Sequence, residues 1–215
     1  HGINLNSRAL DRGVNGFEIY VTGAHAETIA CSQASGYDHQ VIEAGLPRFD
    51  ALIPTPPSRT IVFMPTWRSY LAASRFQTSA NQRAFVGSTY HRFVEGLLTD
   101  PRLHALLRQY DFRLELLPHY NMRSVINSDT ITDERVDVLS FDEVDVQQKL
   151  LQADLFMTDY SSVQFDIAYL GTPLIYTQFD EQEFQSGHGD YTWFDTATDG
   201  FGPIARTVDE TIVLI

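Results

Sequence analysis

Short apolar stretches of strand length alternate with stretches of helical spacing through most of this chain, and this alternation limits the folds open to it. After residue 58 the strand candidates are RTIVFMPTW, FRLELLPHY, RVDVLS, DLFMTD and TPLIYTQ. The stretches with apolar residues at helical spacing are 82–98, 100–110, 143–153 and 161–171. Strands that alternate with helices form mostly parallel sheets with helices on both faces. The pattern therefore predicts an α/β fold with a Rossmann-like parallel sheet.

A proline-rich stretch, IPTPPSRT from Ile53 to Thr60, divides the chain into two parts. Its prolines cannot continue a helix or a central strand, so it suits a linker. Before it, GFEIYVTG, AHAETIACSQA and HQVIEAGLPRFD indicate a strand, a helix and a second strand. We therefore expect residues 1–55 to be the last part of one Rossmann-like domain and residues 56–215 to form a second. The chain starts at His1 rather than Met, so we also expect a piece of a longer protein.

Composition excludes several classes of protein. The formal net charge of −13 disfavours a nucleic-acid partner and a surface that holds an anionic membrane by itself. The single cysteine, Cys31, excludes an internal disulfide. No stretch reaches the roughly 20 apolar residues of a membrane-spanning helix. No metal-ligand spacing, dinucleotide fingerprint, P-loop or GxSxG elbow occurs, so we expect no metal and no other cofactor.

The stretch TDYSSVQFDIAYLG places small hydroxyls where a strand turns into a helix. Ligands of open parallel sheets bind beyond the carboxyl ends of the strands, where helix N-termini favour anions. Ser161 and Ser162 are therefore candidate phosphate ligands, and Asp159 and Asp166 add polar groups near the same point. The alternative is that one serine simply caps the helix.

Two further strand ends carry candidate groups. LLPHYNMR places His119 just after a strand, and a histidine there can neutralise a phosphate or donate a proton to a leaving group. Arg123, four residues later, is a candidate phosphate ligand, and so is Arg68 at the end of FMPTWR. A hydrogen-bonded structural histidine and an ordinary ion pair are the alternatives for His119 and Arg68. His1, in HGI, carries little meaning by itself.

Taken together, the segments resemble one family. HGI, AGLPRFDAL, MPTWR, LPHYN, ADLFMTDYSSVQFDIAYLGTPLIYTQFD and FGPIARTVDE follow one another as in the CDP-glycerol glycerophosphotransferases, the teichoic-acid primases and polymerases of Gram-positive cell envelopes. The resemblance spans nearly the whole chain. It implies a GT-B fold, in which two Rossmann-like domains face each other across a cleft and the second binds the donor.

The resemblance also implies a reaction and roles for individual residues. A polyol phosphate would pass from CDP-glycerol or CDP-ribitol to a hydroxyl of a lipid-linked polyol-phosphate acceptor, with release of CMP. His1 would match the base that deprotonates the acceptor, and His119 the histidine that holds the donor pyrophosphate and assists CMP departure. Donor phosphates would also be contacted or supported by Ser161, Ser162, Asp166 and Arg68.

Two other functions stay open from sequence. One is a GT-B glycosyltransferase that uses a nucleotide sugar and binds its diphosphate at the same helix N-terminus. The other is a non-catalytic module that binds a CDP-alcohol. For the transferase, we expect a cytoplasmic parent protein held peripherally at the inner face of the cell membrane by segments outside this chain.

Overall fold

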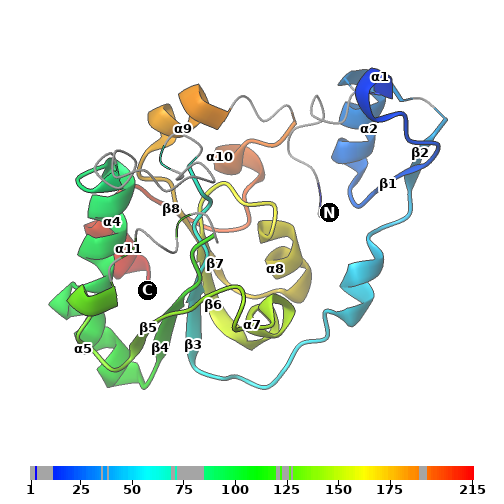
Figure 1. Cartoon of the computed structure of the whole chain (residues 1–215). Helices are drawn as coiled ribbons and strands as arrows, with labels where there is room; N and C mark the ends of the chain where they lie inside the picture. Colours follow the sequence, from blue (N-terminus) through cyan, green and yellow to red (C-terminus); the bar gives the residue numbers. More distant parts are fainter. Residues whose placement is uncertain are drawn as a thin grey trace.

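The chain folds into a parallel six-stranded sheet covered by helices on both faces, preceded by a small parallel pair of strands (Figure 1). The computed structural model describes residues 3, 12–34, 36–37, 39–68, 71, 85–119, 122, 126, 128–188 and 193–215. His1 and Arg123 lie outside the described residues. The predicted α/β fold with a parallel sheet between helices is confirmed.

The order of strands in the large sheet is β5-β4-β3-β6-β7-β8, and each described pairing is parallel. The strands are β1 (Tyr20–Thr22), β2 (Val41–Glu43), β3 (Thr60–Phe63), β4 (Arg113–Leu116), β5 (Val136–Val138), β6 (Ala153–Thr158), β7 (Leu174–Thr177) and β8 (Ile204–Ala205). The helical segments are α1 (Arg12–Asn15), α2 (His25–Ala34), η2 (Pro47–Ala51), α4 (Thr89–Leu98), α5 (Pro101–Tyr110), η3 (Ser128–Thr130), α7 (Val146–Gln152), α8 (Gln164–Leu170), α9 (Glu181–His188), α10 (Thr196–Asp199) and α11 (Val208–Leu214).

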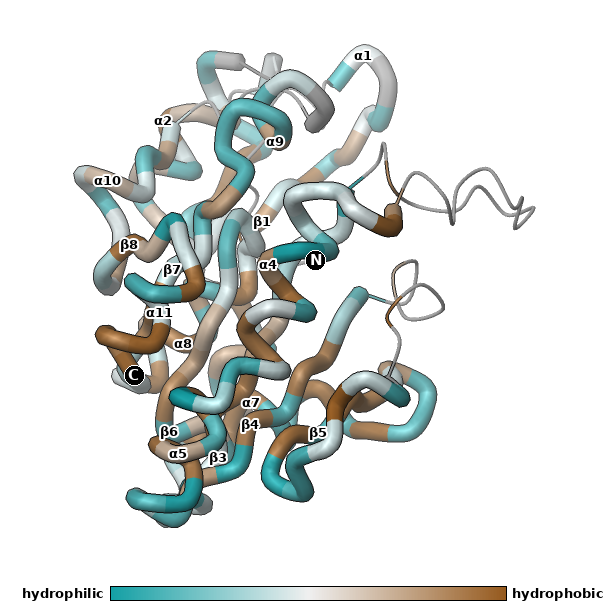
Figure 2. The backbone as a smooth tube through the Cα atoms, turned by 90° about the vertical axis from the view of Figure 1, so that its left-hand side faces the viewer, coloured by the Kyte–Doolittle hydropathy of each residue, from teal (hydrophilic) through white to brown (hydrophobic). Residues whose placement is uncertain are grey.

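The strands are apolar on both sides because each face of the sheet carries helices. In β3, Ile61 and Phe63 join the core under α4, α5 and α11, whereas Val62 joins the core under α7 and α8. Successive strand residues point to opposite faces, so a run such as TIVF supplies both cores at once. Figure 2 shows brown, hydrophobic segments both in the sheet and in helices that cover it, such as α11.

Two stretches predicted as helices differ from the pattern at their starts. The helix predicted over 82–98 is interrupted: residues 82–84 lie outside the described part, Phe85 is helical, and α4 starts at Thr89, because Gly87 has a φ of +82° and the Ser88 hydroxyl accepts the His91 N–H at 3.1 Å. The helix predicted from Ser161 starts at Gln164. Its predicted end is confirmed, since Gly171 takes the left-handed conformation at the C-terminus with a φ of +71°.

The start of α5 agrees with its sequence signals. Asp100 accepts the Arg102 N–H at 2.8 Å, and Pro101 occupies the first turn. A proline fits there because the first N–H groups of a helix have no partner within the helix.

The first unit pairs β1 with β2 and packs α2 against them. It exposes Ile19, Val21 and Ile42, which are 63%, 40% and 44% accessible. Figure 1 shows this unit to the right of the large sheet, linked to it through η2 and the stretch 52–59. On η2, the Phe49 ring lies 4.8 Å from that of Tyr169 on α8.

Two glycine substitutions test the close approach of the chain to the sheet edge. A Cβ at Gly202 would lie 1.9 Å from the Leu174 carbonyl oxygen, whereas one at Gly96 on α4 meets only Val208 Cγ2, at 3.7 Å. We expect Gly202→Ala to lower the free energy of unfolding by about 1–3 kcal/mol. Gly96→Ala should raise it by about 0.5–1 kcal/mol, because alanine favours the helix. Urea denaturation measures both, and an equally stable Gly202→Ala protein would contradict the packing described here.

Candidate functional site

The strand order places a natural ligand site at the carboxyl ends of β3 and β6. From β3 the chain adds β4 and β5 on one side, and from β6 it adds β7 and β8 on the other. The order therefore reverses between β3 and β6, and open α/β sheets bind ligands in the crevice at such a switch point. The segments that follow β3, β4 and β6 hold Arg68, His119 and the serine pair.

The turn after β6 leaves backbone donors available. The Tyr160 N–H donates to Asp159 Oδ1 at 2.6 Å, and the Val163 N–H donates to the Ser161 hydroxyl at 3.3 Å. The backbone N–H groups of Ser161 and Ser162, and the Ser162 hydroxyl, bond to no described residue. Successive N–H groups without partners at the start of a helix form an anion-binding concavity. Ser161 thus serves as a local cap through its side chain, while its N–H remains available to a ligand.

His119 lies against the loop that follows β3. Its ring stacks on Trp67 with centroids 5.6 Å apart and planes 21° apart. Burial lowers the pKa of His119 below its usual value of 6.5, so the neutral ring prevails near pH 7. The same loop touches the serine turn, because the Thr66 N–H donates to Asp159 Oδ1 at 2.8 Å. One loop therefore joins His119 to the turn that carries Ser161 and Ser162.

Arg68 is fully buried, and two carboxylates share its guanidinium. Its Nε and Nη2 donate to Asp180 at 2.7 and 2.8 Å, and Nη2 also donates to Asp159 at 2.8 Å. Nη1 donates to the Thr66 carbonyl at 2.6 Å. Burial by itself lowers the pKa of Arg68, but the two carboxylates outweigh it and raise the pKa above its usual range.

Aromatic rings complete the surroundings of this guanidinium. The Arg68 Cζ lies 4.9–5.5 Å from four ring centroids, those of Tyr90, Tyr160, Phe179 and Phe184. With its side chain 0% exposed, Arg68 offers no surface to a donor phosphate. Arg68 therefore joins the loops after β3, β6 and β7, and its expected contact with a donor phosphate stays a sequence-based prediction.

Asp166 is also committed to a protein partner. Its carboxylate accepts a hydrogen bond from Arg48 Nη2 of η2, and its side chain is 4% exposed. Burial raises the pKa of Asp166, and the Arg48 charge opposes that rise. The pair joins α8 to the segment before the proline-rich stretch. Asp166 therefore fixes that segment against α8, and its expected support of the donor phosphates stays a sequence-based prediction.

The partners of Arg68 were not predicted from the sequence. Asp159 was expected only as a further polar group near the serines, and Asp180 had no predicted role. A signal was present, since an aspartate follows each of β6 and β7 closely while an arginine follows β3. The carboxyl ends of parallel strands meet at one edge, so three such charges are brought together there.

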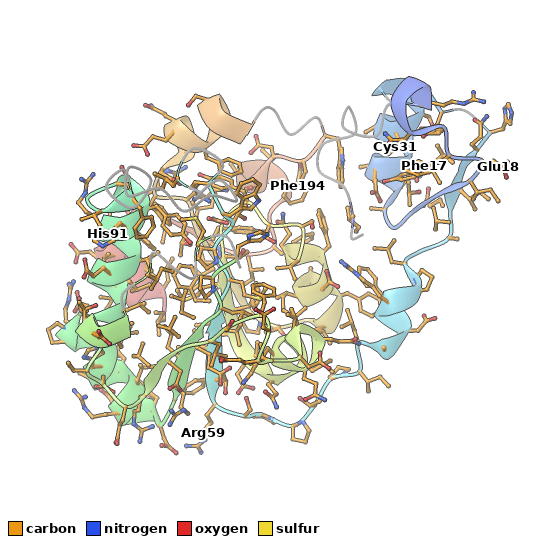
Figure 3. All side chains as sticks on the ribbon, viewed as in Figure 1. Phe17, Glu18, Cys31, Arg59, His91 and Phe194 are labelled. Atoms are coloured by element: carbon orange, nitrogen blue, oxygen red, sulfur yellow. The ribbon has the colours of Figure 1, made fainter. Side chains whose placement is uncertain are left out.

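The opposite edge of the sheet also gathers cations, but they are paired. Figure 3 labels Arg59 at this lower edge, which it shares with Arg113 and Arg135. Asp111 accepts from Arg59 at 3.1 Å and from Arg135 at 3.0 Å, and Asp137 accepts from Arg113 at 2.7 Å. The intervening carboxylates repel an added anion, so the carboxyl edge is the better phosphate site.

Within the described ranges, no group of three or more histidine, cysteine, aspartate or glutamate side chains is placed to hold a metal ion. In the part of the chain that the structure describes, no helix is both long enough and apolar enough to cross a membrane.

Replacing Arg68 by methionine tests whether the two buried carboxylates depend on it. We expect Arg68→Met to lower the free energy of unfolding by about 3–5 kcal/mol, because Asp159 and Asp180 are left as unpaired buried charges. The surface pair of Arg113, whose side chain is 49% exposed, is the matched control, and Arg113→Met should cost less than about 1 kcal/mol. Urea denaturation compares the two, and equal losses would contradict the role of Arg68.

Comparisons with known proteins find relatives that make teichoic acids. Minor teichoic acid biosynthesis protein GgaB of Bacillus subtilis (strain 168) is 25% identical over 213 residues, which are 95% of this chain and 23% of that protein. Teichoic acid poly(ribitol-phosphate) polymerase of Bacillus spizizenii is 28% identical over 88% of this chain and 31% of its own length. The chain therefore spans about a quarter to a third of these relatives.

Solved structures support the fold and the family model supports the family. A variant of the wall teichoic acid polymerase TagF soaked with CDPG superposes with a TM-score of 0.69 at 20% identity, covering 96% of this chain and 50% of that one. A family model described as CDP-glycerol:poly(glycerophosphate) glycerophosphotransferase matches residues 6–215. The chain belongs to this glycerophosphotransferase family.

Proposed function

We propose that the protein containing this chain transfers a polyol phosphate from CDP-glycerol or CDP-ribitol to a hydroxyl of an acceptor polymer and releases CMP. The observation that carries the proposal is the pair of N–H groups at Ser161 and Ser162, which bond to no described residue at the switch point of the sheet. Family membership names the donor class that such a diphosphate site takes.

In the proposed reaction, an acceptor oxygen attacks the distal phosphorus of the donor. The bond from phosphorus to the CMP oxygen breaks, and a base removes the acceptor proton. Negative charge spreads over the phosphoryl oxygens, so donors held in place before the reaction lower its barrier. Ser161 and Ser162 supply N–H donors, and the half-buried His119 ring supplies one more and steadies departing CMP. The roles of His1 as base and of Arg123 as phosphate ligand rest on sequence alone, since both lie outside the described residues.

We also propose that residues 1–55 are the end of an acceptor-side Rossmann-like domain and residues 56–215 the donor-binding domain. The parallel β1–β2 pair with α2 between its strands in sequence has the connectivity of such a domain. Its exposed Ile19, Val21 and Ile42 suit a face that further chain covers, and the chain covers half of the TagF structure. A lipid-linked acceptor and a peripheral place at the inner membrane face, through segments outside this chain, belong to the same proposal.

CMP release from CDP-alcohols tests the function directly. The full-length protein is incubated with CDP-glycerol or CDP-ribitol and a lipid-linked polyol-phosphate acceptor. We expect acceptor-dependent CMP, and loss of the hydroxyl donor in Ser162→Ala should slow its release roughly tenfold, which is the worth of one ordinary hydrogen bond. Absence of CMP from every CDP-alcohol overturns the proposal. Turnover of a UDP- or GDP-sugar favours the glycosyltransferase alternative, and CDP-glycerol binding without turnover favours the non-catalytic one.

The lowered pKa of His119 predicts proton uptake on donor binding. A diphosphate beside the ring favours the charged imidazole and so raises the pKa that burial had lowered below 6.5. Between about pH 6 and 7, CDP-glycerol binding should therefore take up a proton, which calorimetry in buffers of different ionisation enthalpy detects. His119→Gln should remove the uptake, and His25→Gln, a change on α2, should leave it intact. Uptake that persists in His119→Gln would contradict the assignment.

The lowered pKa of His119 also determines how pH changes the stability of the folded chain when no ligand is bound. Because its pKa is lower in the folded chain, the unfolded chain binds more protons near pH 6. The His119 contribution to stability is therefore present above pH 6.5 and is lost as the pH falls toward the folded-state pKa.

A further inference from the structure

The segment between η2 and β3 leads out of the first unit, but it is attached to the large sheet and its helices, which we call the second unit. The attachments are an ion pair, a ring contact and several hydrogen bonds. They join Arg48 to Asp166, Phe49 to Tyr169, Ala51 to Gln147, Thr55 to Leu151, and Ser58 to Gln152 and Asp154. All of these partners lie in α7, α8 or β6. The proline-rich stretch is therefore a poor place for the chain to bend.

Arg48 makes the attachment that lies nearest to the proposed phosphate site. Its side chain is 40% exposed, and it donates to the carboxylate of Asp166, which is 4% exposed. Asp166 is in the first turn of α8, the helix that follows Ser161 and Ser162. Figure 1 shows η2, in cyan, beside α8 on the path from the first unit to β3. A buried carboxylate depends on its ionic partner, so Arg48 ties η2 to the helix behind the serine turn.

Gly45 lies between the last bonds to the first unit and the first bond of η2. The N–H groups of Ala44 and Gly45 both donate to the Thr22 carbonyl of β1, at 3.4 and 3.2 Å. The Leu46 carbonyl accepts the Phe49 N–H of η2 at 2.9 Å. Gly45 has a φ of +77°, and a Cβ there would meet no described atom within 4 Å. A glycine in open space changes its backbone angles without a clash, so Gly45 and Leu46 form a natural joint.

A small apolar cluster connects the two units across this joint. Its described members come from both sides: Ile3 and Ala24 lie before the joint, and Phe165, Trp193 and Phe194 lie after it. The cluster is much smaller than the core under α4, α5 and α11. Units joined by a small interface are expected to move relative to each other.

We propose that Arg48 is a positioning residue: by holding η2 on Asp166, it makes the first unit turn about Gly45 and Leu46 rather than about the proline-rich stretch. η2 and the stretch 52–59 then move with the second unit, although part of them precedes residue 55. The consequence for catalysis rests on the proposed function, in which the first unit belongs to the acceptor side. A joint fixed beside α8 brings the acceptor side back to the same place over the serine turn.

Spin-label distances in the full-length protein test the joint without a ligand or turnover. One label pair joins Ser32 on α2 to Val213 on α11, and a second joins Asp50 on η2 to Val213; all three positions are exposed. Cys31 is buried, and other accessible cysteines are replaced by serine. We expect a broad distance distribution for the first pair and a narrow one for the second. Arg48→Leu should broaden the second distribution, and Arg48→Lys, which keeps the cation, should leave it narrow.

Arg108→Leu is the matched control for loss of an arginine that is paired with a buried carboxylate. Arg108 is 57% exposed, and the side chain of its partner Asp133 is 8% exposed. This variant should leave both distributions unchanged. The proposal is overturned if the two distributions of the unchanged protein are equally broad or equally narrow, or if the Asp50–Val213 distribution stays narrow in folded Arg48→Leu protein.

Kinetics of the same variants test the consequence for the proposed reaction. Because Arg48 sets the place of the acceptor side, Arg48→Leu should raise the KM for the acceptor roughly tenfold while calorimetry finds CDP-glycerol bound as tightly as before. Arg108→Leu should change neither quantity. An unchanged acceptor KM in Arg48→Leu overturns the positioning role. Distance distributions as predicted, together with a failure to release CMP, support the joint and overturn the proposed reaction alone.

Discussion

Arg68 joins three loops at one edge of the sheet, and the arrangement of the site depends on it. Its guanidinium holds Asp159 and Asp180 in a buried cluster enclosed by aromatic rings. Pairing buried charges adds little net stability over an apolar core, but removing one member leaves the others uncompensated. Asp159 in turn accepts the N–H groups of Thr66 and Tyr160, which sets the path of the chain into the serine turn. The cluster therefore acts by positioning.

Under the proposed function, an acidic chain has to bind an anionic donor. The formal net charge of −13 opposes a nucleoside diphosphate at long range, although salt screens such fields beyond about 8 Å. Binding of the donor must then come from hydrogen-bond donors in direct contact with it. In the proposed site, the backbone N–H groups of Ser161 and Ser162 supply them without adding a charge. Arg68, which the fold brings next to this turn through its hydrogen bond to Asp159, is already neutralised by carboxylates.

The sequence predicted the fold well and the site in part. Buried parallel strands must be apolar on both sides, so apolar runs such as TIVF and LFMT can be predicted as strands from the sequence alone. The position of Ser161 and Ser162 followed from the strand-to-helix pattern. The pairing of Arg68 with Asp180 did not, because the two residues are far apart in sequence and meet only through the strand order. The start of α8 at Gln164 was missed for a local reason: Asp159 and the Ser161 hydroxyl accept N–H groups of the turn, and the helix begins after them.

The account rests on a diphosphate held by Ser161 and Ser162 opposite His119. A crystal structure of the full-length protein with CDP-glycerol tests this most directly. The account predicts phosphate oxygens within hydrogen-bond distance of both serine N–H groups and of the His119 ring, with Arg68 still paired to its carboxylates. A donor whose diphosphate lies elsewhere, with these N–H groups bound only to water, would contradict it.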